Sequence, residues 1–208
     1  MENLQKKFDV IVVGAGTGGS TAARFAAENG LSVCLIDSKD KREIGNKICG
    51  DAVGNAIFDF LKIKHPRDDE LSCKIKGAKL YSPNFKKCID LTDPKQAGYI
   101  VNRIEFGQRL LSEALDAGVE YFSDNTMALD LLYDQSTVSG VKAKLSNGEK
   151  TELHSKIVID ASGFYSPLRK KLKSSLVEKE VFKEDSILCY REIVEFSPQD
   201  IKINNPDY

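Results

Sequence analysis

The stretch Phe8–Gly19, FDVIVVGAGTGG, decides the fold of this chain. Apart from Asp9, its first six residues are apolar and rich in β-branched side chains, which is typical of a strand buried on both faces of a parallel sheet. The alanine-rich segment Ser20–Asn29 follows and predicts a helix that ends at Gly30. A second apolar run, Leu31–Ile36, predicts the next strand. The first forty residues therefore predict one βαβ unit.

The glycines between the first strand and the helix fit the pattern GxGxxG and predict a dinucleotide site. Gly14 makes the tight turn, Gly16 lets a pyrophosphate approach the backbone, and Gly19 lets the helix pack closely on the strand. The N–H groups that begin the helix would then face the phosphates. Asp37 stands about 20 residues further on, where an acid binds the ribose hydroxyls. The competing interpretation is a structural glycine turn with a solvated aspartate.

The rest of the chain predicts further elements of two kinds. Alternating segments within 72–100 indicate antiparallel strands outside the parallel sheet. Apolar residues at helical spacing indicate a helix from Arg103 to Ala117. The remaining predicted elements are a short helix at Ala56–Leu61, a strand at Val119–Phe122, a β-meander over Met127–Leu145 with a turn at Asn147–Gly148, a buried strand at Lys156–Asp160, a helix from Ser166 to Lys173 and a strand at Ser186–Phe196.

Two of these elements favour FAD over NAD as the dinucleotide. The segment Lys156–Gly163, KIVIDASG, is a buried strand that ends in a turn of small residues. It resembles the second glycine signature of flavoproteins with two dinucleotide domains, in which this turn passes near the FAD. The meander lies where those proteins insert three strands, whereas an NAD dehydrogenase would continue βαβαβ. Asp160 is a candidate general base, although an aspartate that caps the turn is the more common case.

Two segments carry a more specific family resemblance. Asp160–Arg169, DASGFYSPLR, resembles the DG-type signature of aromatic hydroxylases. Lys47–Gly54, KICGDAVG, resembles the loop of archaeal-type geranylgeranyl reductases that carries Cys-Gly-Asp against the isoalloxazine. The resemblance implies a Rossmann-type, aromatic-hydroxylase-like α/β fold that binds FAD. The predicted cofactor-binding residues are Gly14, Ala15, Gly16, Thr17, Gly18, Gly19, Asp37, Ser38, Cys49, Gly50, Asp51, Ala52, Arg103, Ala128, Asp160, Ala161 and Gly163.

Two side chains in this set have alternative interpretations. The resemblance places Cys49 close to the flavin and the substrate double bond, where its thiol is the candidate catalytic acid. A buried, unreactive cysteine is the alternative. The resemblance also implies that Arg103 pairs with the phosphates of the cofactor, which suits a forked guanidinium. A surface arginine at a helix N-terminus is the alternative for that position.

The resemblance implies a flavin-dependent reductase of geranylgeranyl double bonds in membrane-lipid synthesis. Its partners would be an isoprenoid lipid and an electron donor, NADPH or ferredoxin, between which the sequence does not choose. Other classes stay open: an FAD-dependent monooxygenase or halogenase, a quinone-linked electron-transfer dehydrogenase, and a module that uses FAD only for structure. The CGD loop favours the reductase.

The composition bears on the binding partners and the location of the protein. The 208 residues are 41% hydrophobic and carry a formal net charge of −1, with lysine and arginine scattered along the chain, which argues against a nucleic-acid partner. The five cysteines form no CxxC pair, so no metal site is expected. No signal peptide and no apolar run of membrane-spanning length is evident. The expected location is cytoplasmic, with peripheral membrane association left open.

The predicted domains are an FAD-binding domain, residues 1–71 and 101–173, and parts of a substrate domain, residues 72–100 and 174–208. The chain ends without a closing helix, and it lacks two elements of the resembled family: a second FAD-contacting Gly-Asp segment and an aromatic-rich segment that lines the lipid tunnel. We expect both beyond Tyr208, so that the chain is incomplete.

Overall fold

The computed structural model describes residues 7–92 and 97–192, and its main body is a six-stranded sheet with helices on one face. The strand order is β8-β2-β1-β11-β10-β9. The four strands from β8 to β11 run parallel, whereas β11, β10 and β9 are antiparallel neighbours. The sheet strands are β1 (Lys7–Val13), β2 (Val33–Ile36), β8 (Glu120–Tyr121), β9 (Met127–Asp134), β10 (Thr137–Lys144) and β11 (Lys150–Asp160).

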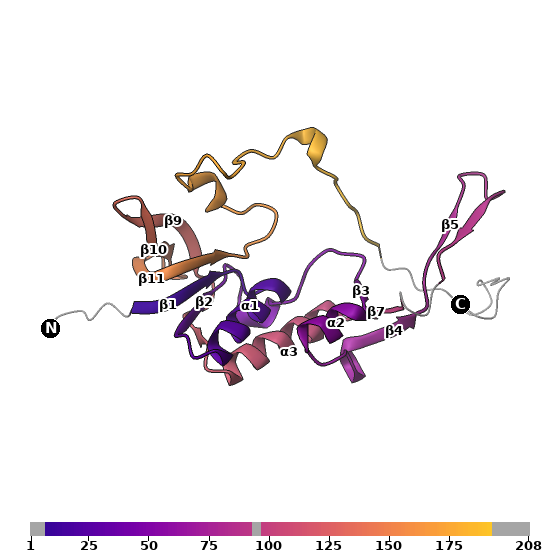
Figure 1. Ribbon diagram of the computed structural model, residues 1–208, viewed down its shortest axis with the longest axis horizontal. Helices are drawn as coiled ribbons and strands as arrows, with labels where there is room; N and C mark the ends of the chain where they lie inside the picture. Colours follow the sequence, from indigo (N-terminus) through magenta and orange to yellow (C-terminus); the bar gives the residue numbers. More distant parts are fainter. Residues whose placement is uncertain (1–6, 93–96, 193–208) are drawn as a thin grey trace.

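The two principal helices cover the same face of this sheet (Figure 1). They are α1 (Thr17–Glu28) and α3 (Arg103–Asp116). Successive residues of β1 point to opposite faces, as a strand requires. Val10 and Val12 therefore join the cluster beneath the helices, while Ile11 and Val13 join the cluster shared with the meander. This burial on both faces explains why the run in β1 is continuously apolar rather than alternating.

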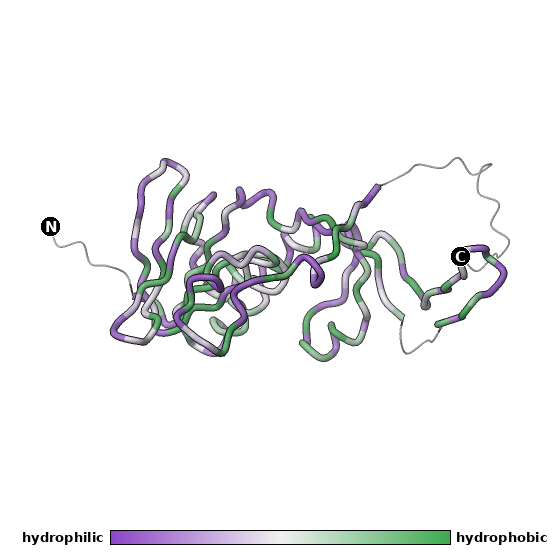
Figure 2. Tube along the Cα trace, turned by 90° about the horizontal axis from the view of Figure 1, so that it is seen from above, coloured by the Kyte–Doolittle hydropathy of each residue, from purple (hydrophilic) through white to green (hydrophobic). Residues whose placement is uncertain are grey.

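A smaller unit lies beside the main body. It contains a three-stranded sheet in the order β3-β7-β4 and a two-stranded hairpin, β5-β6, which projects from the molecule (Figure 1). Phe58 and Phe106 pack together in a third hydrophobic cluster that joins this unit to α3. Its elements are β3 (Ala52–Gly54), α2 (Ala56–Leu61), β4 (Leu71–Ile75), β5 (Lys79–Tyr81), β6 (Cys88–Asp90) and β7 (Gly98–Val101). Figure 2 shows the resulting elongated shape, with the meander and the hairpin at opposite ends.

Most predicted elements are confirmed, with three differences. The predicted strand 156–160 is the second half of β11, whose first half pairs with β10 as the last strand of the meander. The predicted helix 166–173 is wrong: only one 3₁₀ turn, Arg169–Lys171, forms there. The strand predicted for 186–196 is also wrong over 186–192, which carries no regular structure, and 193–196 lie outside the described residues. Its hydrophobic side chains find no partner strand among the described residues, so the alternating pattern alone does not make a strand.

Candidate functional site

The predicted site residues converge at the carboxyl edge of the parallel strands. β1, β2 and β11 end in register, because Val13 pairs with both Ile36 and Asp160. The glycine turn, Asp37 and the DASG turn follow these three strand ends directly. In open α/β sheets, ligands bind at this edge.

The glycine turn is closed on its inner side and open on its outer side. A Cβ atom on Gly19 would overlap the carbonyl oxygen of Gly14, and one on Gly14 would lie 2.5 Å from the carbonyl oxygen of Ala161. Gly16 and Gly18 are exposed, and no described atom lies within 4 Å of the place where their Cβ atoms would be. Within the described residues no side chain caps the N-terminus of α1. Its first N–H groups thus face open space of the kind that a pyrophosphate fills.

Asp37 lies against this turn. One of its carboxylate oxygens accepts a hydrogen bond from the backbone N–H of Ala15 at 2.6 Å, and the other accepts one from Lys39 at 2.8 Å. Each carboxylate oxygen can accept a further hydrogen bond, so Asp37 is still able to bind a hydroxyl. The carbonyl of Asp37 also accepts the N–H of Thr126 at 2.7 Å, which brings the start of β9 and buried Ala128 to this edge. Ser38 follows Asp37 and is exposed.

Asp160 caps the turn that follows β11. Its carboxylate accepts hydrogen bonds from the Ser162 hydroxyl at 2.5 Å and from the Ser166 hydroxyl at 2.7 Å. The backbone N–H of Ala161 donates to the carbonyl of Val13 at 2.8 Å, which fixes the turn beside the glycine loop. Gly163 has a φ of +85°, a conformation that glycine adopts without strain. These contacts support the turn-capping interpretation of Asp160 over the general base.

The CGD loop meets the N-terminus of α3. The Arg103 guanidinium donates to the Cys49 sulfur at 3.2 Å and, through Nε, to the Asp51 carboxylate at 3.4 Å. Gly50 is exposed, and Ala52 begins β3. A guanidinium has five N–H donors, so Arg103 keeps donors for an anion while it makes both contacts. The alternative of an ordinary surface arginine does not fit, because only 15% of its side chain is exposed.

The Cys49 thiol is electrostatically activated. The backbone N–H of Asp51 and the positive charge of Arg103 lower the pKa of Cys49, against a partial burial that acts in the opposite direction. Hydrogen bonds and positive charge both favour the thiolate over the thiol. Cys49 is only partly buried and its sulfur contacts a guanidinium, which differs from the fully buried apolar setting of the alternative interpretation.

A pocket of about 430 Å³ connects Arg103 with the glycine loop. Thr17, Gly18 and Arg103 form its polar side, and Phe25 and Phe106 are among the apolar residues that line the rest. The pocket thus places the arginine on the same cavity as the N-terminus of α1.

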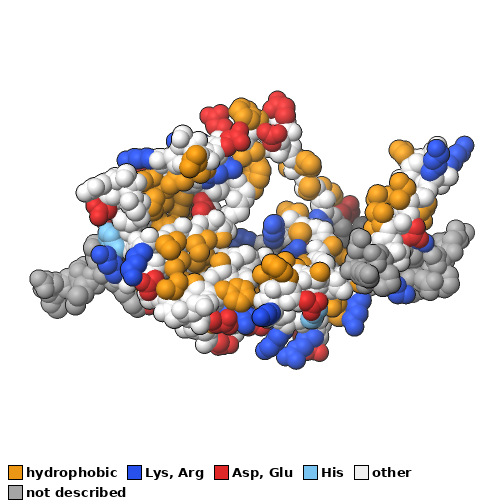
Figure 3. Space-filling view, viewed as in Figure 1, with side chains coloured by type: hydrophobic (Ala, Val, Ile, Leu, Met, Phe, Trp, Pro, Cys, Tyr) orange, Lys and Arg blue, Asp and Glu red, His pale blue; other side chains and the backbone are white. Residues whose placement is uncertain are grey.

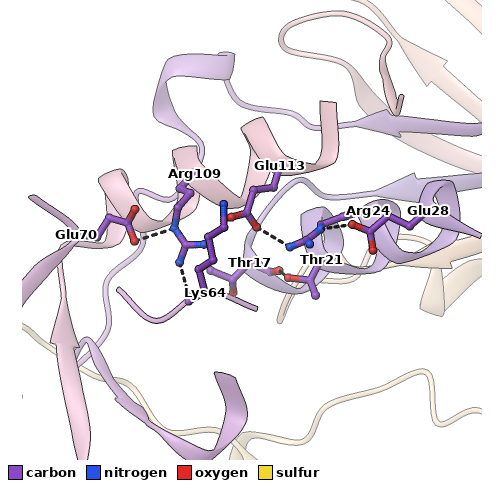
Figure 4. A network of polar contacts seen from close by, with 8 residues as sticks. All are labelled: Thr17, Thr21, Arg24, Glu28, Lys64, Glu70, Arg109 and Glu113. Atoms are coloured by element: carbon purple, nitrogen blue, oxygen red, sulfur yellow. Dashed lines mark hydrogen bonds and ion pairs between the residues drawn. The ribbon is translucent and has the colours of Figure 1, made fainter. Parts of the chain in front are cut away.

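An ion-pair network holds α1 and α3 in this relative position (Figure 4). Glu113 of α3 accepts from Arg24 of α1 at 2.7 Å and from Arg109 at 2.8 Å. Arg109 also donates to Glu70 at 2.8 Å and to the carbonyl of Lys64 at 3.0 Å. The network ties the two helices whose N-termini carry the glycine loop and Arg103.

Three features of the site were not predicted from the sequence. β3 follows the CGD loop and pairs with β7, so the loop is held by a sheet. A Cβ atom on Gly107 would overlap the backbone of Gly45, so α3 and the loop after β2 touch through glycines. Arg191 donates to the Asp51 carboxylate at 2.5 Å across 140 residues of sequence. Gly107 within a helical pattern was the one available signal, since a glycine there often marks a close backbone approach.

Comparisons with known proteins agree with this geometry. The family model described as FAD-dependent oxidoreductase matches residues 9–164. The digeranylgeranylglycerophospholipid reductase of Sulfolobus acidocaldarius is 36% identical over 190 residues, which are 90% of this chain and 41% of the relative. The reductase of the same name from Picrophilus torridus is 34% identical over 95% of this chain and 49% of its own. The chain thus spans less than half the length of these curated relatives.

Solved structures give the same result. A geranylgeranyl bacteriochlorophyll reductase-like protein from Thermoplasma acidophilum superposes with a TM-score of 0.74 at 33% identity, over 82% of this chain and 43% of that one. The myxobacterial FAD-dependent halogenase CndH superposes with a TM-score of 0.64 at 24% identity, over 80% and 39%, which shows a shared fold alone. The expected Rossmann-type flavoprotein fold and the resemblance to geranylgeranyl reductases are confirmed.

Proposed function

This chain belongs to the family of FAD-dependent oxidoreductases, and from that premise we propose that it is the FAD-binding part of a reductase of isoprenoid carbon–carbon double bonds. The observation that carries the proposal is the contact between Arg103 and Cys49, because Arg103 also lines the pocket that reaches the glycine loop. The names of the relatives supply the substrate class, an unsaturated isoprenoid glycerophospholipid.

The residues at the carboxyl edge fit FAD. The open space over Gly16 and Gly18 suits the pyrophosphate, and the Asp37 carboxylate suits the adenosine ribose. Arg103 faces the same pocket and has donors left for a phosphate oxygen. We assign residues 1–71 and 101–173 to the FAD-binding domain and residues 72–100 and 174–208 to a substrate domain.

Bound FAD would supply hydride to one alkene carbon once an electron donor such as NADPH or ferredoxin had reduced it. The chain's own part is to position the alkene, exclude water and deliver a proton to the other carbon. The Cys49 thiol is the candidate donor. Because its pKa is lowered, the thiol is a stronger acid, and the protonated fraction falls as the pH rises through that lowered pKa. Reduction through this thiol should therefore slow at alkaline pH.

The substrate class also requires a route to a lipid surface, and we assign that contact to the β5-β6 hairpin. Residues 71–89 contain five lysines and no acidic residue, within a chain of net charge −1. Asp90, the last residue of β6, lies 3.9 Å from Lys79. Leu80 and Phe85 are 55% and 77% exposed. Figure 3 shows hydrophobic and basic side chains together on the projecting hairpin. Lysines with exposed apolar side chains suit an anionic bilayer surface. In the part of the chain that the structure describes, no helix has the length and apolar composition needed to cross a bilayer.

Sedimentation with vesicles tests this contact. Charge reversal of Lys86 and Lys87 together should abolish binding to vesicles that contain anionic phospholipid, whereas reversal of the exposed Lys179 and Lys183 should leave it unchanged. Equal binding of both variants would show that the hairpin is covered in the whole protein or faces another partner.

Single-turnover kinetics without oxygen tests the reaction itself. The reduced protein is mixed with a geranylgeranyl lipid, and flavin reoxidation is followed by absorbance. Cys49→Ser keeps a donor of similar size but raises its pKa far above that of a thiol. If Cys49 delivers the proton, reoxidation should slow by about 10²- to 10⁴-fold while FAD stays bound. A change of only a few-fold would assign the proton to water or to another group.

A further inference from the structure

Asp51 contacts the two arginines, Arg103 and Arg191, that lie near Cys49. Its carboxylate accepts from Arg103 at 3.4 Å and from Arg191 at 2.5 Å, and its side chain is only 16% exposed. Its backbone N–H donates to the Cys49 sulfur. Its carbonyl accepts the N–H of Val101 at 3.0 Å, which fixes the residue to the strand before α3. All the polar groups of Asp51 are thus engaged within the protein.

The backbone of Asp51 is held in an uncommon conformation. Its φ of +59° lies in the left-handed region, which aspartate tolerates better than most residues but at some cost. Such conformations persist where the surrounding contacts determine them. The backbone N–H of this residue lowers the pKa of the Cys49 thiol, two residues earlier.

We propose that Asp51 is a positioning residue, which holds the Arg103 guanidinium against the Cys49 thiol and thereby orients both groups. That the oriented pair faces flavin and substrate rests on the proposed function. The Asp51 carboxylate contacts Arg103 and Arg191, so the role proposed for it is to hold the guanidinium of Arg103. Its influence on Cys49 therefore passes through Arg103.

The direction in which the pKa of Cys49 shifts when the charge of Asp51 is removed separates this positioning role from a direct electrostatic effect of Asp51 on the thiol. The charged groups around Cys49 are Asp51 in its own loop, Arg103 from α3 and Arg191, which contacts the Cys49 carbonyl at 3.4 Å. The negative charge of Asp51 by itself raises the pKa of the thiol, so its removal alone should lower that pKa. If Asp51 instead holds Arg103 in place, its removal should release the guanidinium and raise the pKa.

The rate of Cys49 alkylation by iodoacetamide reports this pKa, because only the thiolate reacts. The protein is prepared without flavin and with the exposed Cys73, Cys88 and Cys189 replaced by serine, while Cys34 is buried. Asp51→Asn keeps the size of the side chain, and asparagine tolerates the left-handed backbone as aspartate does. In this variant we expect the pH midpoint of the alkylation rate to rise by about one pH unit, which means about tenfold less thiolate at low pH. Asp51→Gly should shift it in the same direction.

Two controls complete the test. Asp68→Asn changes another aspartate in the left-handed conformation, far from Cys49 in sequence, and should leave the midpoint unchanged. In an Arg103→Ala background, Asp51→Asn should no longer raise the midpoint, because the effect acts through Arg103. A midpoint that falls or stays constant in Asp51→Asn, or a rise that persists without Arg103, would overturn the proposal.

Added FAD distinguishes this inference from the proposed function. If the pair faces the flavin, saturating FAD should protect Cys49 from alkylation in the parent protein. If FAD does not protect Cys49 but Asp51→Asn still raises the midpoint, the proposed flavin site is contradicted and the role of Asp51 stands. Protection without the shift would refute the role of Asp51 and leave the site intact.

Discussion

Replacement of Gly16 and of Gly19 should separate cofactor binding from folding within one motif. A Cβ atom at position 16 would meet no described atom within 4 Å apart from its chain neighbours, and the extended backbone there, with φ −61° and ψ −178°, suits a β-branched residue. Gly16→Val should therefore fold normally. An alanine at position 19 would overlap the carbonyl oxygen of Gly14, so Gly19→Ala must push the helix away from the strand.

The magnitudes follow from these contacts. In Gly16→Val the side chain occupies the space of the pyrophosphate, which loses at least one or two charge-assisted hydrogen bonds of about 1.5–3 kcal/mol each. A loss of about 3 kcal/mol weakens FAD binding by about 150-fold. In Gly19→Ala, overpacking costs about 1–3 kcal/mol of folding free energy. In a chain of this size that lowers Tm by about 2–12 °C.

The assays are FAD titration by flavin fluorescence and thermal unfolding of the flavin-free protein. Gly54→Val is the matched control, because Gly54 is exposed, has open space around its Cβ position and is not among the predicted cofactor-binding residues. Unchanged FAD affinity in Gly16→Val would refute the assignment of the pyrophosphate to this turn. An unchanged Tm in Gly19→Ala would refute the close helix–strand packing.

Three further predictions concern charged side chains. Arg103→Ala should weaken FAD binding by about 1.5–3 kcal/mol if the guanidinium holds a phosphate, and equal loss in the exposed control Arg67→Ala would contradict this. Glu113→Gln removes the carboxylate charge that Arg24 and Arg109 share, so the free energy of unfolding should fall by about 1–3 kcal/mol in thermal unfolding. An unchanged Tm would show that the ion-pair network does not contribute to stability. Hydrogen bonds from Lys156 and Ser32 hold the pKa of Asp9 well below its usual range. The stability difference between the parent and Asp9→Asn should therefore be full above about pH 4 and shrink progressively as the pH falls below it; a difference that stays undiminished between about pH 4 and pH 2 would contradict the shift.

Local patterns predicted the βαβ unit well because each signal there is a contiguous stretch of sequence. The apolar run of β1, the glycine turn and the alanine-rich helix are read within about twenty residues, and their register at the sheet edge follows from parallel pairing. The meander and the helix that begins at Arg103 were found for the same reason.

The two elements that were predicted wrongly, the strand over 186–192 and the helix over 166–173, have a suitable local sequence but lack the contacts that would form the element. The alternating segment 186–192 has the composition of a strand, yet within the described residues it has no neighbouring strand to pair with. The segment 166–173 carries a helix-start signal, but Ser166 is held by Asp160, and the chain turns after one 3₁₀ turn. The first segment lacks a partner strand, and in the second a local side-chain hydrogen bond holds the residue that would begin the helix.

The sequence by itself determined the dinucleotide-binding strand, turn and helix, the acid at Asp37 and the family resemblance of the CGD loop, because these depend on residue types at fixed short spacings. Only the tertiary structure decided which side chains of the site meet. Cys49, Asp51, Arg103 and Arg191 come from three distant segments. The pairing of β3 with β7, the strand before α3, brings the first two segments together, and Arg191 reaches Asp51 from the third. Electrostatic effects act through space over a few ångströms, so the state of the Cys49 thiol follows from that packing.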